Sequence, residues 1–544
     1  MSSNTWLPTL FSNSEQWLTR YASGNWSGCS PSSFASVDLP NIQLLALTAE
    51  PRVNYTYVPS VIAPPYNNIT AGLDFCNVTV TYTHPGWNDT IVTTIFLPTK
   101  NWNGRYQAHG GAGYVSGGSG LLFLGMMPAL AEGYAGSTTD GGHISNLASL
   151  SGPTMPWALS SPGNVNWPLL LDYASVSQHE MAQLSKLAIQ DFYEELPKYS
   201  YFFGASQGGR QGNMYAQRFP EDFDGITALF PAVNWNQRAA LVAWPGFVMD
   251  QAGVHPPACE MYAITKAAIK ACDLLDGVED GLISRPDLCT FDAHSVVGQA
   301  FDCEGTPSTI SKGAAIVTQA TWEGPRSSTG KFQWYGYLRG ANISAPGAPA
   351  GTTCTVSNST GIRTCVPAPY YLGEVWLRYW VLKYADASIR NITHEQWDEL
   401  VDAASQEYDS VIGTADPDLS RFKRAGGKMI TWHGLTDNLI TPNGTVDYYN
   451  RVTALDPEVH DYFRFFLAPG IAHEFGGTLR VTDSYPASNR YIVDWVEKGI
   501  APEVLRQTGV DPKGNVLERD LCPYPKVQHY IGGDLTKAEA FKCV

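Results

Sequence analysis

The chain has 544 residues, of which 44% are hydrophobic and 16% charged, so its composition is that of a globular protein and not of a disordered one. The formal net charge of -16 argues against nucleic acid and against anionic membrane surfaces as partners. No apolar run approaches the length of a membrane span, so we expect no membrane partner either.

The ten cysteines form an even set, and several have short separations typical of loop-closing disulfides. The short pairs are Cys272 with Cys289, Cys354 with Cys365, and Cys522 with Cys543. We also expect Cys29 to pair with Cys76. The partners of Cys259 and Cys303 stay open, although pairing them with each other is the simplest choice.

Asn-x-Ser/Thr sequons are more frequent than residue frequencies predict, and each indicates a surface position in a secretory protein. They lie at Asn25, Asn54, Asn68, Asn77, Asn88, Asn342, Asn358, Asn391 and Asn443. The first residues, Met1 to Thr5, contain neither a basic n-region nor an apolar h-region. We therefore expect a secreted glycoprotein whose signal peptide has been replaced by an initiator methionine.

The first hundred residues favour β-strands, and alternation over 77–82 and 91–97 predicts two antiparallel strands. A later strand ends in the glycine-rich loop 102–113, which contains a His-Gly-Gly sequence. Loops of this type supply a backbone N–H to an oxyanion in esterases, so we expect one donor from Gly111 or Ala112. A plain flexible loop is the alternative.

A polar turn at 133–143 carries Asp140 and His143, which we interpret as a hydrogen-bonded turn close to the site and not as catalytic residues. The pattern over 179–193 predicts a helix that leads directly into the next strand.

That strand, 199–203, runs into Gly204-Ala205-Ser206-Gln207-Gly208, and a helix is expected from 213 to 219. A strand, a tight turn and a helix with one serine at the apex form the nucleophile elbow of an α/β-hydrolase. Larger residues two positions from Ser206 would collide with the neighbouring strand or helix. The N–H of Gln207, at the helix start, is the other expected oxyanion donor. An ordinary turn with a solvated serine is the alternative.

Residues 236–414 differ from the rest, because they are rich in Gly, Pro and aromatics and carry six of the ten cysteines. The stretches 324–326 and 334–337 within them have no strong periodicity. An insertion after the nucleophile is where α/β-hydrolases place a lid that shapes the substrate pocket. We therefore predict an α/β-hydrolase catalytic domain made of 1–235 and 415–544, with 236–414 as a lid domain.

Two further polar positions follow the insertion. An apolar strand ends in a turn that carries Asp437, and an aromatic strand is followed by a glycine-rich loop with His473. The chain order Ser206, Asp437, His473 is that of α/β-hydrolases, and each residue follows a strand. We predict that these three form a catalytic triad. His433 and His460 compete for the base, and we interpret them as a packing residue and a surface residue.

Together these segments resemble the tannase and feruloyl esterase family, which also includes a hydrolase of mono(hydroxyethyl) terephthalate. The resemblance covers nearly the whole chain. It rests on the loop 102–113, the segment 133–143, the elbow with its trailing Gly208-Gly209-Arg210, the Asp437 turn and the Pro469-Gly470-Ile471-Ala472-His473 loop. It implies an α/β-hydrolase fold and hydrolysis of carboxylic esters, with aromatic or phenolic acids as the expected acyl groups.

Residues 272–283 are similar to the calcium loop in the lid of this family. Asp273, Asp276 and Asp280 in a glycine-broken loop place three carboxylates within reach of one hard cation. The resemblance implies that the backbone carbonyls of Val278 and Leu282 complete the shell. Because the spacing is not that of an EF-hand, we expect a structural Ca²⁺ and not a sensor site. A solvated acidic turn is the alternative.

The chain departs from the family at two positions. The family usually has a cysteine immediately before the nucleophile and another immediately after the catalytic histidine, joined by a disulfide. Here these positions are Ala205 and Glu474, so packing must hold Ser206 and His473 in reach of each other.

We therefore predict a secreted serine esterase whose substrate is a small-molecule ester and whose oligomeric state is monomer or homodimer. The lid offers aromatic side chains for stacking on an aromatic acyl group: Trp322, Trp334, Tyr335, Tyr337, Tyr370 and Tyr371. An acyltransferase, or a hydrolase of a specialised metabolite, is the first alternative. A catalytically silent binding protein on the same fold is the second, and the three filled triad positions argue against it.

Overall fold

The structure is a computed structural model. It describes residues 28–57, 70–118, 123–143, 152–356, 359, 363–368, 371–473, 480–481, 484–511 and 514–544. Of the positions singled out in the sequence, the ones that lie outside the described residues are Asn25, Asn68, Asn358, Tyr370 and Glu474.

A 12-stranded mixed sheet forms the centre of the molecule. In spatial order its strands are β1 (Gln43–Tyr57), β2 (Thr70–Thr83), β3 (Ile91–Pro98), β5 (Ala135–Thr139), β4 (Arg105–His109), β8 (Tyr199–Ala205), β9 (Gly225–Leu229), β14 (Lys428–Gly434), β15 (Phe463–Ala468), β18 (Val516–Pro523), β17 (Leu505–Val510) and β16 (Arg480–Val481). The central strands from β5 to β15 run parallel, and antiparallel strands extend the sheet at both edges. Parallel strands joined by helices place their carboxyl ends at one edge, where α/β proteins build their sites.

Helices cover both faces of this sheet and connect its strands. They are α1 (Phe123–Ala131), α4 (Val176–Tyr193), α5 (Gln207–Arg218), α11 (Ser420–Arg424), α12 (Pro442–Leu455) and α13 (Ser484–Lys498). α3 (Trp167–Ala174) packs on α4 and in the core of the segment inserted after β9. Apolar residues of α4, α5 and α12 pack with the strands in one hydrophobic cluster. Residues of α1 and α13 pack against the strands in other clusters. The α/β-hydrolase fold predicted from the sequence is confirmed by the solved structures compared below.

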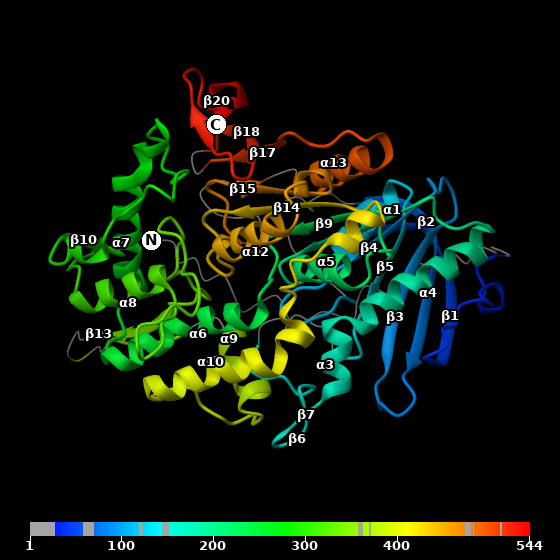
Figure 1. The fold of residues 1–544 in the computed structure, drawn as a ribbon, viewed down its shortest axis with the longest axis horizontal. Coiled ribbons are helices and arrows are strands. Elements are labelled where there is room, and N and C mark those ends of the chain that lie inside the picture. The colour runs from blue at the N-terminus through cyan, green and yellow to red at the C-terminus, as the bar shows by residue number, and fades with distance from the viewer. Residues whose placement is uncertain are drawn as a thin grey trace.

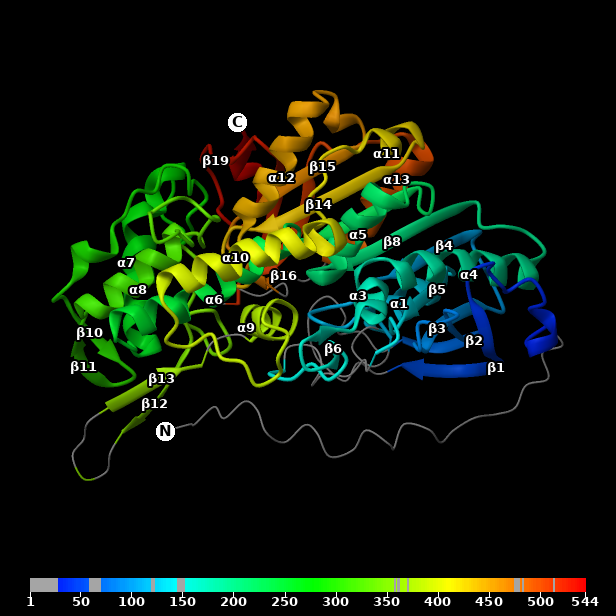
Figure 2. The same cartoon turned by 60° about the horizontal axis from the view of Figure 1, so that its bottom comes forward.

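The chain leaves the main sheet after β9 and returns to it with β14. In between it forms α6 (Trp235–Ala252), α7 (Ala258–Cys272), α8 (Lys312–Glu323), α9 (Leu372–Trp376) and α10 (His394–Tyr408). Small hairpins of this inserted segment are β10 (Ala300–Cys303) with β11 (Thr306–Thr309) and β12 (Thr352–Val356) with β13 (Arg363–Pro367). The segment lies at one end of the molecule and β1 to β3 lie at the other (Figures 1 and 2).

The inserted segment has a hydrophobic core of its own, rich in tryptophan, and this core continues into residues that precede the nucleophile strand. Trp376, Trp380 and Trp397 are fully buried in it. The segment predicted as the lid therefore contains several helices. α6 is buried on most sides and has apolar residues all around it, whereas α8 and α10 each bury one face.

Two short two-stranded sheets complete the fold: β6 (Leu159–Ser161) with β7 (Asn164–Val165), and β19 (Gln528–Tyr530) with β20 (Phe541–Cys543). Among the described residues, no helix is long and apolar enough to cross a membrane.

The structure contains five disulfides: Cys29–Cys76, Cys259–Cys303, Cys272–Cys289, Cys354–Cys365 and Cys522–Cys543. These are the pairs expected from the sequence, and Cys259 and Cys303, whose partners were open, pair with each other. Three of the disulfides lie within the inserted segment, which they cross-link locally.

The described sequons divide by exposure. Asn54, Asn88 and Asn391 are exposed, whereas Asn77, Asn342 and Asn443 are half-buried. Glycosylation itself stays a prediction at all of these positions.

Candidate active site

Ser206 lies at the apex of the turn between β8 and α5, which begins at Gln207 and not near 213 as predicted. Its backbone has φ 60° and ψ -118°, a conformation that is costly for any residue with a side chain. The surrounding backbone holds it there, because the Ser206 N–H donates to Leu229 O and the Ala232 N–H donates to Ser206 O. Strain maintained by neighbouring hydrogen bonds is typical of a nucleophile elbow.

The glycines of the elbow are required by close backbone approach. A Cβ on Gly204 would lie 2.3 Å from Gly208 O, and a Cβ on Gly208 would lie 2.9 Å from Gly111 O. Both contacts are with backbone, which cannot rotate away as a side chain can. The steric reason given for the Gly-x-Ser-x-Gly pattern therefore holds in the structure.

The structure brings the predicted acid and base to this serine. His473 Nε2 lies 3.1 Å from Ser206 Oγ, and His473 Nδ1 lies 2.9 Å from Asp437 Oδ2. Asp437 follows β14 and His473 follows β15, so the parallel strands β8, β14 and β15 present the three side chains at one sheet edge, with β9 between β8 and β14. A nucleophile, a base and a carboxylate in hydrogen-bond sequence can deprotonate the serine and stabilise the resulting imidazolium.

Asp437 is held by more groups than the motif indicates. Its Oδ1 accepts the N–H groups of Leu439 and Ile440 at 2.9 and 2.8 Å. Its Oδ2 lies 3.2 Å from His433 Nε2 as well as beside His473. Burial alone would raise the pKa of Asp437, but the charge of His473 and the hydrogen bonds from His433 and His473 hold it well below its usual value.

The sequence interpretation of His433 as a packing residue missed its contact with the catalytic carboxylate. His433 is fully buried, as expected of a packing residue, but it also contacts the carboxylate of Asp437. Its Nδ1 lies 2.9 Å from Thr445 Oγ1, and its Nε2 lies 3.0 Å from Ile440 O. The signal that could have found it is its spacing from Asp437, four residues along the same strand-to-turn segment.

The expected oxyanion donors differ in whether they already have an acceptor within the protein. The Gly111 N–H donates to Gln211 Oε1 at 2.8 Å, and the Ala112 N–H donates to Val115 O at 3.1 Å. Both donors are therefore engaged within the protein. The Gln207 N–H differs, because it is the first of α5 and donates to no acceptor among the described residues.

Gln211 ties the glycine-rich loop to the nucleophile helix. Besides accepting from Gly111, its Nε2 donates to Ser116 O at 2.9 Å, and the side chain is fully buried. A Cβ on Gly110 would lie 2.8 Å from Gly208 Cα, so the loop lies directly against the elbow. The sequence gives no sign of this contact, because the partners are about a hundred residues apart.

The Asp140 turn is structural, as interpreted from the sequence. Asp140 Oδ1 accepts the N–H groups of Val92 and Gly142, both at 2.9 Å, and the carboxylate therefore holds the turn against β3. The ring nitrogens of His143 lie 2.9 Å from Gly141 O and 2.9 Å from Tyr114 O.

The family profile described as "Tannase and feruloyl esterase" matches residues 76–544. The chain belongs to the tannase and feruloyl esterase family. A relative from Arthroderma benhamiae, named "Probable feruloyl esterase", is 37% identical over 93% of this chain and 91% of its own length. The tannase of Aspergillus oryzae is 27% identical over 95% of this chain and 94% of its own.

Solved structures of the family share the fold. The tannin acyl hydrolase of Aspergillus niger matches with a TM-score of 0.81 at 24% identity, covering 95% of each chain. Feruloyl esterase B of Aspergillus oryzae matches with a TM-score of 0.77 at 23% identity, covering 94% of this chain and 100% of its own. The family recognised from the motifs is therefore confirmed, and with it the class of carboxylic ester hydrolases.

Ala205, at the position where the resemblance leads us to expect a cysteine, is half-buried. The ring of Phe230, which follows β9, lies 4.9 Å from the His473 ring in an edge-on arrangement. Phe230 and the hydrogen bonds on both ring nitrogens position the imidazole without a covalent link.

Most of the lid aromatics proposed as stacking surfaces belong to the core of the inserted segment. Trp322, Trp334 and Tyr337 are buried in its hydrophobic cluster. Tyr335 is half-buried and donates to Asp447 Oδ1 at 3.1 Å, whereas Tyr371 is 40% exposed.

The acidic loop expected to hold calcium lies between α7 and the C-terminal strands. Asp273 and Asp276 are buried, and Asp273 Oδ1 and Oδ2 accept the N–H groups of Asp280 and Gly281. Burial and the charges of Asp276 and Asp273 raise the pKa of Asp280 to about 6, although Arg519 lies 3.8 Å from its Oδ2. Negative charge is therefore concentrated in this loop.

Proposed function

We propose that the chain is a serine esterase that hydrolyses esters of aromatic or phenolic acids through Ser206, His473 and Asp437. The observation that carries the proposal is the unbroken hydrogen-bond sequence from Ser206 Oγ through both nitrogens of His473 to Asp437 Oδ2. The substrate class is supported by the relatives, which are named feruloyl esterases and tannases.

In the proposed mechanism, His473 Nε2 takes the Ser206 proton as the hydroxyl oxygen attacks the ester carbonyl. Asp437 keeps the Nδ1–H of His473 directed toward itself and stabilises the imidazolium that forms. His473 then protonates the leaving alcohol, and an acyl-serine remains. Water hydrolyses this acyl-serine by the reverse sequence, with His473 as the base and Ser206 as the leaving group.

The oxyanion of the tetrahedral intermediate needs donors in place before the reaction, each worth about 3 kcal/mol. The Gln207 N–H supplies one of them, because it stands at the helix start beside Ser206 and has no internal acceptor among the described residues. The dipole of α5 adds positive potential at the same point. For Gly111 or Ala112 to supply a second donor, substrate binding must release one of their internal hydrogen bonds.

The test is hydrolysis of methyl ferulate, methyl gallate, a mono(hydroxyethyl) terephthalate ester and p-nitrophenyl acetate. We expect Ser206→Ala to lower kcat/KM on every ester that the wild type turns over by at least about a thousandfold. Ser160→Ala, at an exposed hairpin position, is the control and should retain full activity.

Serine-dependent turnover of the activated acetate alone would leave the triad supported and overturn the proposed substrate class. Full activity in Ser206→Ala would overturn the mechanism. Adding a competing alcohol and measuring ester exchange separates hydrolysis from acyl transfer, and a fluorophosphonate that fails to label Ser206 would favour a silent binding protein.

We also propose that the protein is secreted and glycosylated. The support is the five disulfides, which persist in oxidising compartments, and the exposed sequons Asn54, Asn88 and Asn391. The state as a monomer or a homodimer stays a prediction.

We propose in addition that the loop 273–282 holds a structural Ca²⁺ through Asp273, Asp276, Asp280 and the carbonyls of Val278 and Leu282. The residues fit a hard cation in donor type, because all are oxygen ligands. They also fit in charge, and neither of the two carbonyls accepts a hydrogen bond from the described residues. The three carboxylates do not form a group within 4.8 Å of one another, so the loop would have to close around the ion. Arg519 of β18 lies 3.8 Å from Asp280 Oδ2, so the loop that would hold the ion contacts the catalytic core.

Removal of calcium should lower the thermal stability. We expect a calcium chelator to lower the Tm of the wild type by a few degrees, about the effect of 2–3 kcal/mol in a large domain. The Tm of Asp276→Asn should not respond to calcium, whereas that of Asp287→Asn, an exposed aspartate paired with Arg285 nearby, should respond fully. Equal responses in both variants would argue against the site.

A further inference from the structure

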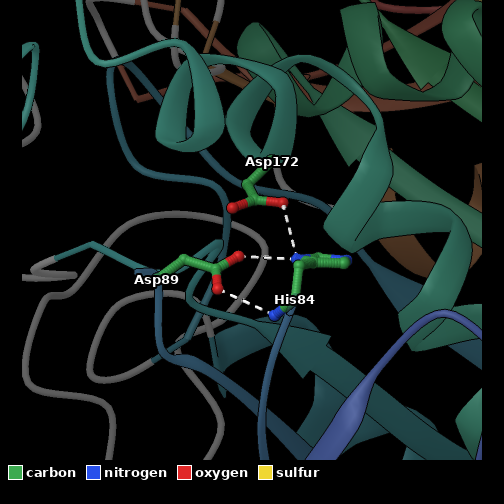
Figure 3. A group of neighbouring side chains, drawn as sticks. All are labelled: His84, Asp89 and Asp172. Carbon is green, nitrogen blue, oxygen red and sulfur yellow. Dashed lines mark hydrogen bonds and ion pairs between the residues drawn. The ribbon is translucent and has the colours of Figure 1, made fainter. Parts of the chain in front are cut away.

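A second cluster of ionisable side chains lies away from the triad, at the junction of the β2–β3 turn with α3 and α4 (Figure 3). It contains His84 and Asp89 from the turn, Asp172 from α3 and Glu180 from α4. All four are buried, and Asp172 is completely so. Among the described residues, no arginine or lysine forms an ion pair with any of these carboxylates.

Two carboxylates of this cluster face the same nitrogen of one imidazole. Asp89 Oδ2 lies 2.6 Å from His84 Nδ1, and Asp172 Oδ1 lies 3.9 Å from it. One ligand atom from each of His84, Asp89 and Asp172 falls within 4.8 Å of the others, and this is the one such group found in the part of the chain that the structure describes. Two atoms bound to one ion at about 2.1 Å lie about 3.0–3.4 Å apart, so small side-chain rotations would close this set around an ion.

Asp172 has no hydrogen-bond partner. Neither of its carboxylate oxygens forms a hydrogen bond within the described structure, although the side chain is fully buried. A buried carboxyl group without a donor carries a large desolvation cost, so a second carboxylate beside it calls for a positive charge or a shared proton. Asp172 points into the space between His84 and Asp89, where such a charge would lie.

The other side of the imidazole has the arrangement found behind metal-bound histidines. His84 Nε2 lies 2.6 Å from Glu180 Oε1, and Glu180 Oε2 accepts the Tyr82 hydroxyl at 2.9 Å. With a metal bound, a carboxylate on the far ring nitrogen would keep the ring proton there and raise the basicity of Nδ1 as a ligand. Without a metal, the Nδ1–H donates to Asp89 Oδ2. Asp89 is held similarly, because its Oδ1 accepts the Thr83 hydroxyl at 2.7 Å and the His84 N–H at 2.8 Å.

From this geometry we propose that His84, Asp89 and Asp172 form a binding site for one divalent transition-metal ion such as Zn²⁺, with Glu180 as the carboxylate that orients the histidine. One nitrogen and two carboxylate ligands suit Zn²⁺ or Mn²⁺, whereas the imidazole makes the site a poor one for Ca²⁺. The site is distinct from the acidic loop of the lid, which has only oxygen donors.

The position of the site implies a structural role. An ion bound there would join the β2–β3 turn to α3 and α4, which lie between the N-terminal strands and the nucleophile helix. The backbone carbonyl of Tyr173, next to Asp172, accepts Arg210 Nη2 at 3.2 Å, and Ala174 O accepts Arg210 Nη1 at 3.0 Å. Arg210 is on α5, one turn after Ser206, so the ion would stabilise the support of the elbow without touching the substrate.

The competing explanation is a proton instead of a metal. Burial alone would lower the pKa of His84, but the hydrogen bonds to Glu180 and Asp89 raise it to about 9. Burial and the neighbouring Asp89 carboxylate raise the pKa of Asp172 to about 9, so without a metal both groups hold a proton near neutral pH. Asp172→Asn separates the two explanations, because an amide keeps the shape of a protonated carboxyl group and removes the charge that a metal ligand needs.

The experiment is zinc binding to the full chain after dialysis against a strong chelator, measured by calorimetry and by metal analysis. The proteins compared are the wild type, Asp172→Asn and Asp276→Asn, the last of which alters only the acidic loop of the lid. We expect one tight zinc site in the wild type and in Asp276→Asn, and none in Asp172→Asn. Zinc at about one hundred times its Kd should shift the unfolding equilibrium of the wild type and of Asp276→Asn toward the folded state by about a hundredfold.

Zinc binding that is equal in the wild type and in Asp172→Asn would overturn the proposal, and so would the absence of any tight site. If the stability of the wild type and of Asp172→Asn is the same, and zinc changes neither, the cluster holds a shared proton and the metal proposal is overturned. If Asp172→Asn does not fold, zinc-edge X-ray absorption on the loaded wild type decides. Scattering from an imidazole around the zinc would support the site. A shell of oxygen atoms alone would overturn it, because the acidic loop 273–282 of the lid contains no histidine and could give such a shell.

Discussion

Asp437 is the residue whose surroundings go furthest beyond its motif. A triad carboxylate needs one histidine, but two imidazoles approach its Oδ2, and two backbone N–H groups hold its Oδ1. His433 cannot accept the serine proton, because it lies behind the carboxylate with its ring nitrogens facing Thr445 and Ile440. We infer that it positions Asp437 and draws negative charge away from the side that faces His473.

Loss of His433 should therefore change both the rate and the pH profile. In His433→Leu we expect kcat to fall about tenfold or more, the value of one hydrogen bond to a charged group. More negative charge on Oδ2 would stabilise protonated His473, so the acid limb of kcat/KM should move to higher pH. The measurement is the pH–rate profile on the best ester of the panel.

His433→Gln is the matched variant, because its amide nitrogen can take the place of Nε2 as a donor to Asp437. It should restore part of kcat and return the acid limb toward that of the wild type. An acid limb that is unchanged in His433→Leu, beside a simple loss of stability, would show that His433 has only a packing role.

At the scale of elements, the glycine-rich loop and α5 behave as one unit. Gln211 accepts from Gly111 and donates to Ser116, and the steric fit of Gly110 against Gly208 leaves no room for a side chain between them. The loop is therefore positioned by the helix that carries the nucleophile. A hydrogen bond at this junction sets how closely any loop donor can approach the oxyanion.

Gln211→Leu should disturb this unit without altering the triad. It leaves the Gly111 N–H and Ser116 O buried without partners, a cost of about 1–3 kcal/mol for each group. We expect a fall of about tenfold in kcat, with a smaller change in KM, measured on the same ester. Gln217→Leu, at the other end of α5, where the side chain donates to Tyr448, is the control and should leave kcat near that of the wild type. Equal losses in both variants would point to general destabilisation of the helix.

Across the whole molecule, a half-buried cluster of charged groups joins segments that are far apart in the chain. Arg105 at the start of β4 forms a two-point contact with Glu497 of α13, at 2.6 and 2.8 Å, across 392 residues. The Tyr201 hydroxyl of β8 donates to the same carboxylate at 2.8 Å. Burial alone would raise the pKa of Glu497, but the hydrogen bonds from Arg105 and Tyr201 hold it below its usual value.

Stability should therefore depend on this carboxylate in a defined pH range. Its pKa is lower in the folded than in the unfolded protein, so its contribution is complete above the unfolded value of about 4.3 and is lost as the pH falls below it. We expect Glu497→Gln to lower the free energy of unfolding by about 1–3 kcal/mol at pH 7. The difference from the wild type should shrink in denaturant titrations carried out below pH 4.

Glu503→Gln is the control for this prediction, because Glu503 pairs with Arg464 at 3.1 Å while its side chain is 80% exposed. Surface pairs contribute little, so its effect should stay within about 0.5 kcal/mol. A pH-independent difference for Glu497→Gln would mean that the side chain acts through packing and not through its charge.

The sequence by itself determined the parts of this protein that depend on neighbours along the chain. The elbow is a local pattern, and so are the strands that precede Ser206, Asp437 and His473, because backbone geometry and alternation act over a few residues. The order of these three residues can be read directly from the chain. The disulfide pairs at short separation belong to the same class. The fold and the family followed from these features together.

Only the tertiary structure decided which groups meet across the sheet and the insertion. Folding brings together the residues of three contacts: the Gly111 N–H with its acceptor, His433 with Asp437, and the cluster around His84. Among the helices of the insertion, α6 lacks the periodicity that marks a surface helix because it is buried on most sides. A hydrogen bond depends on the distance and the angle between donor and acceptor, and a local sequence pattern does not determine either for groups far apart in the chain.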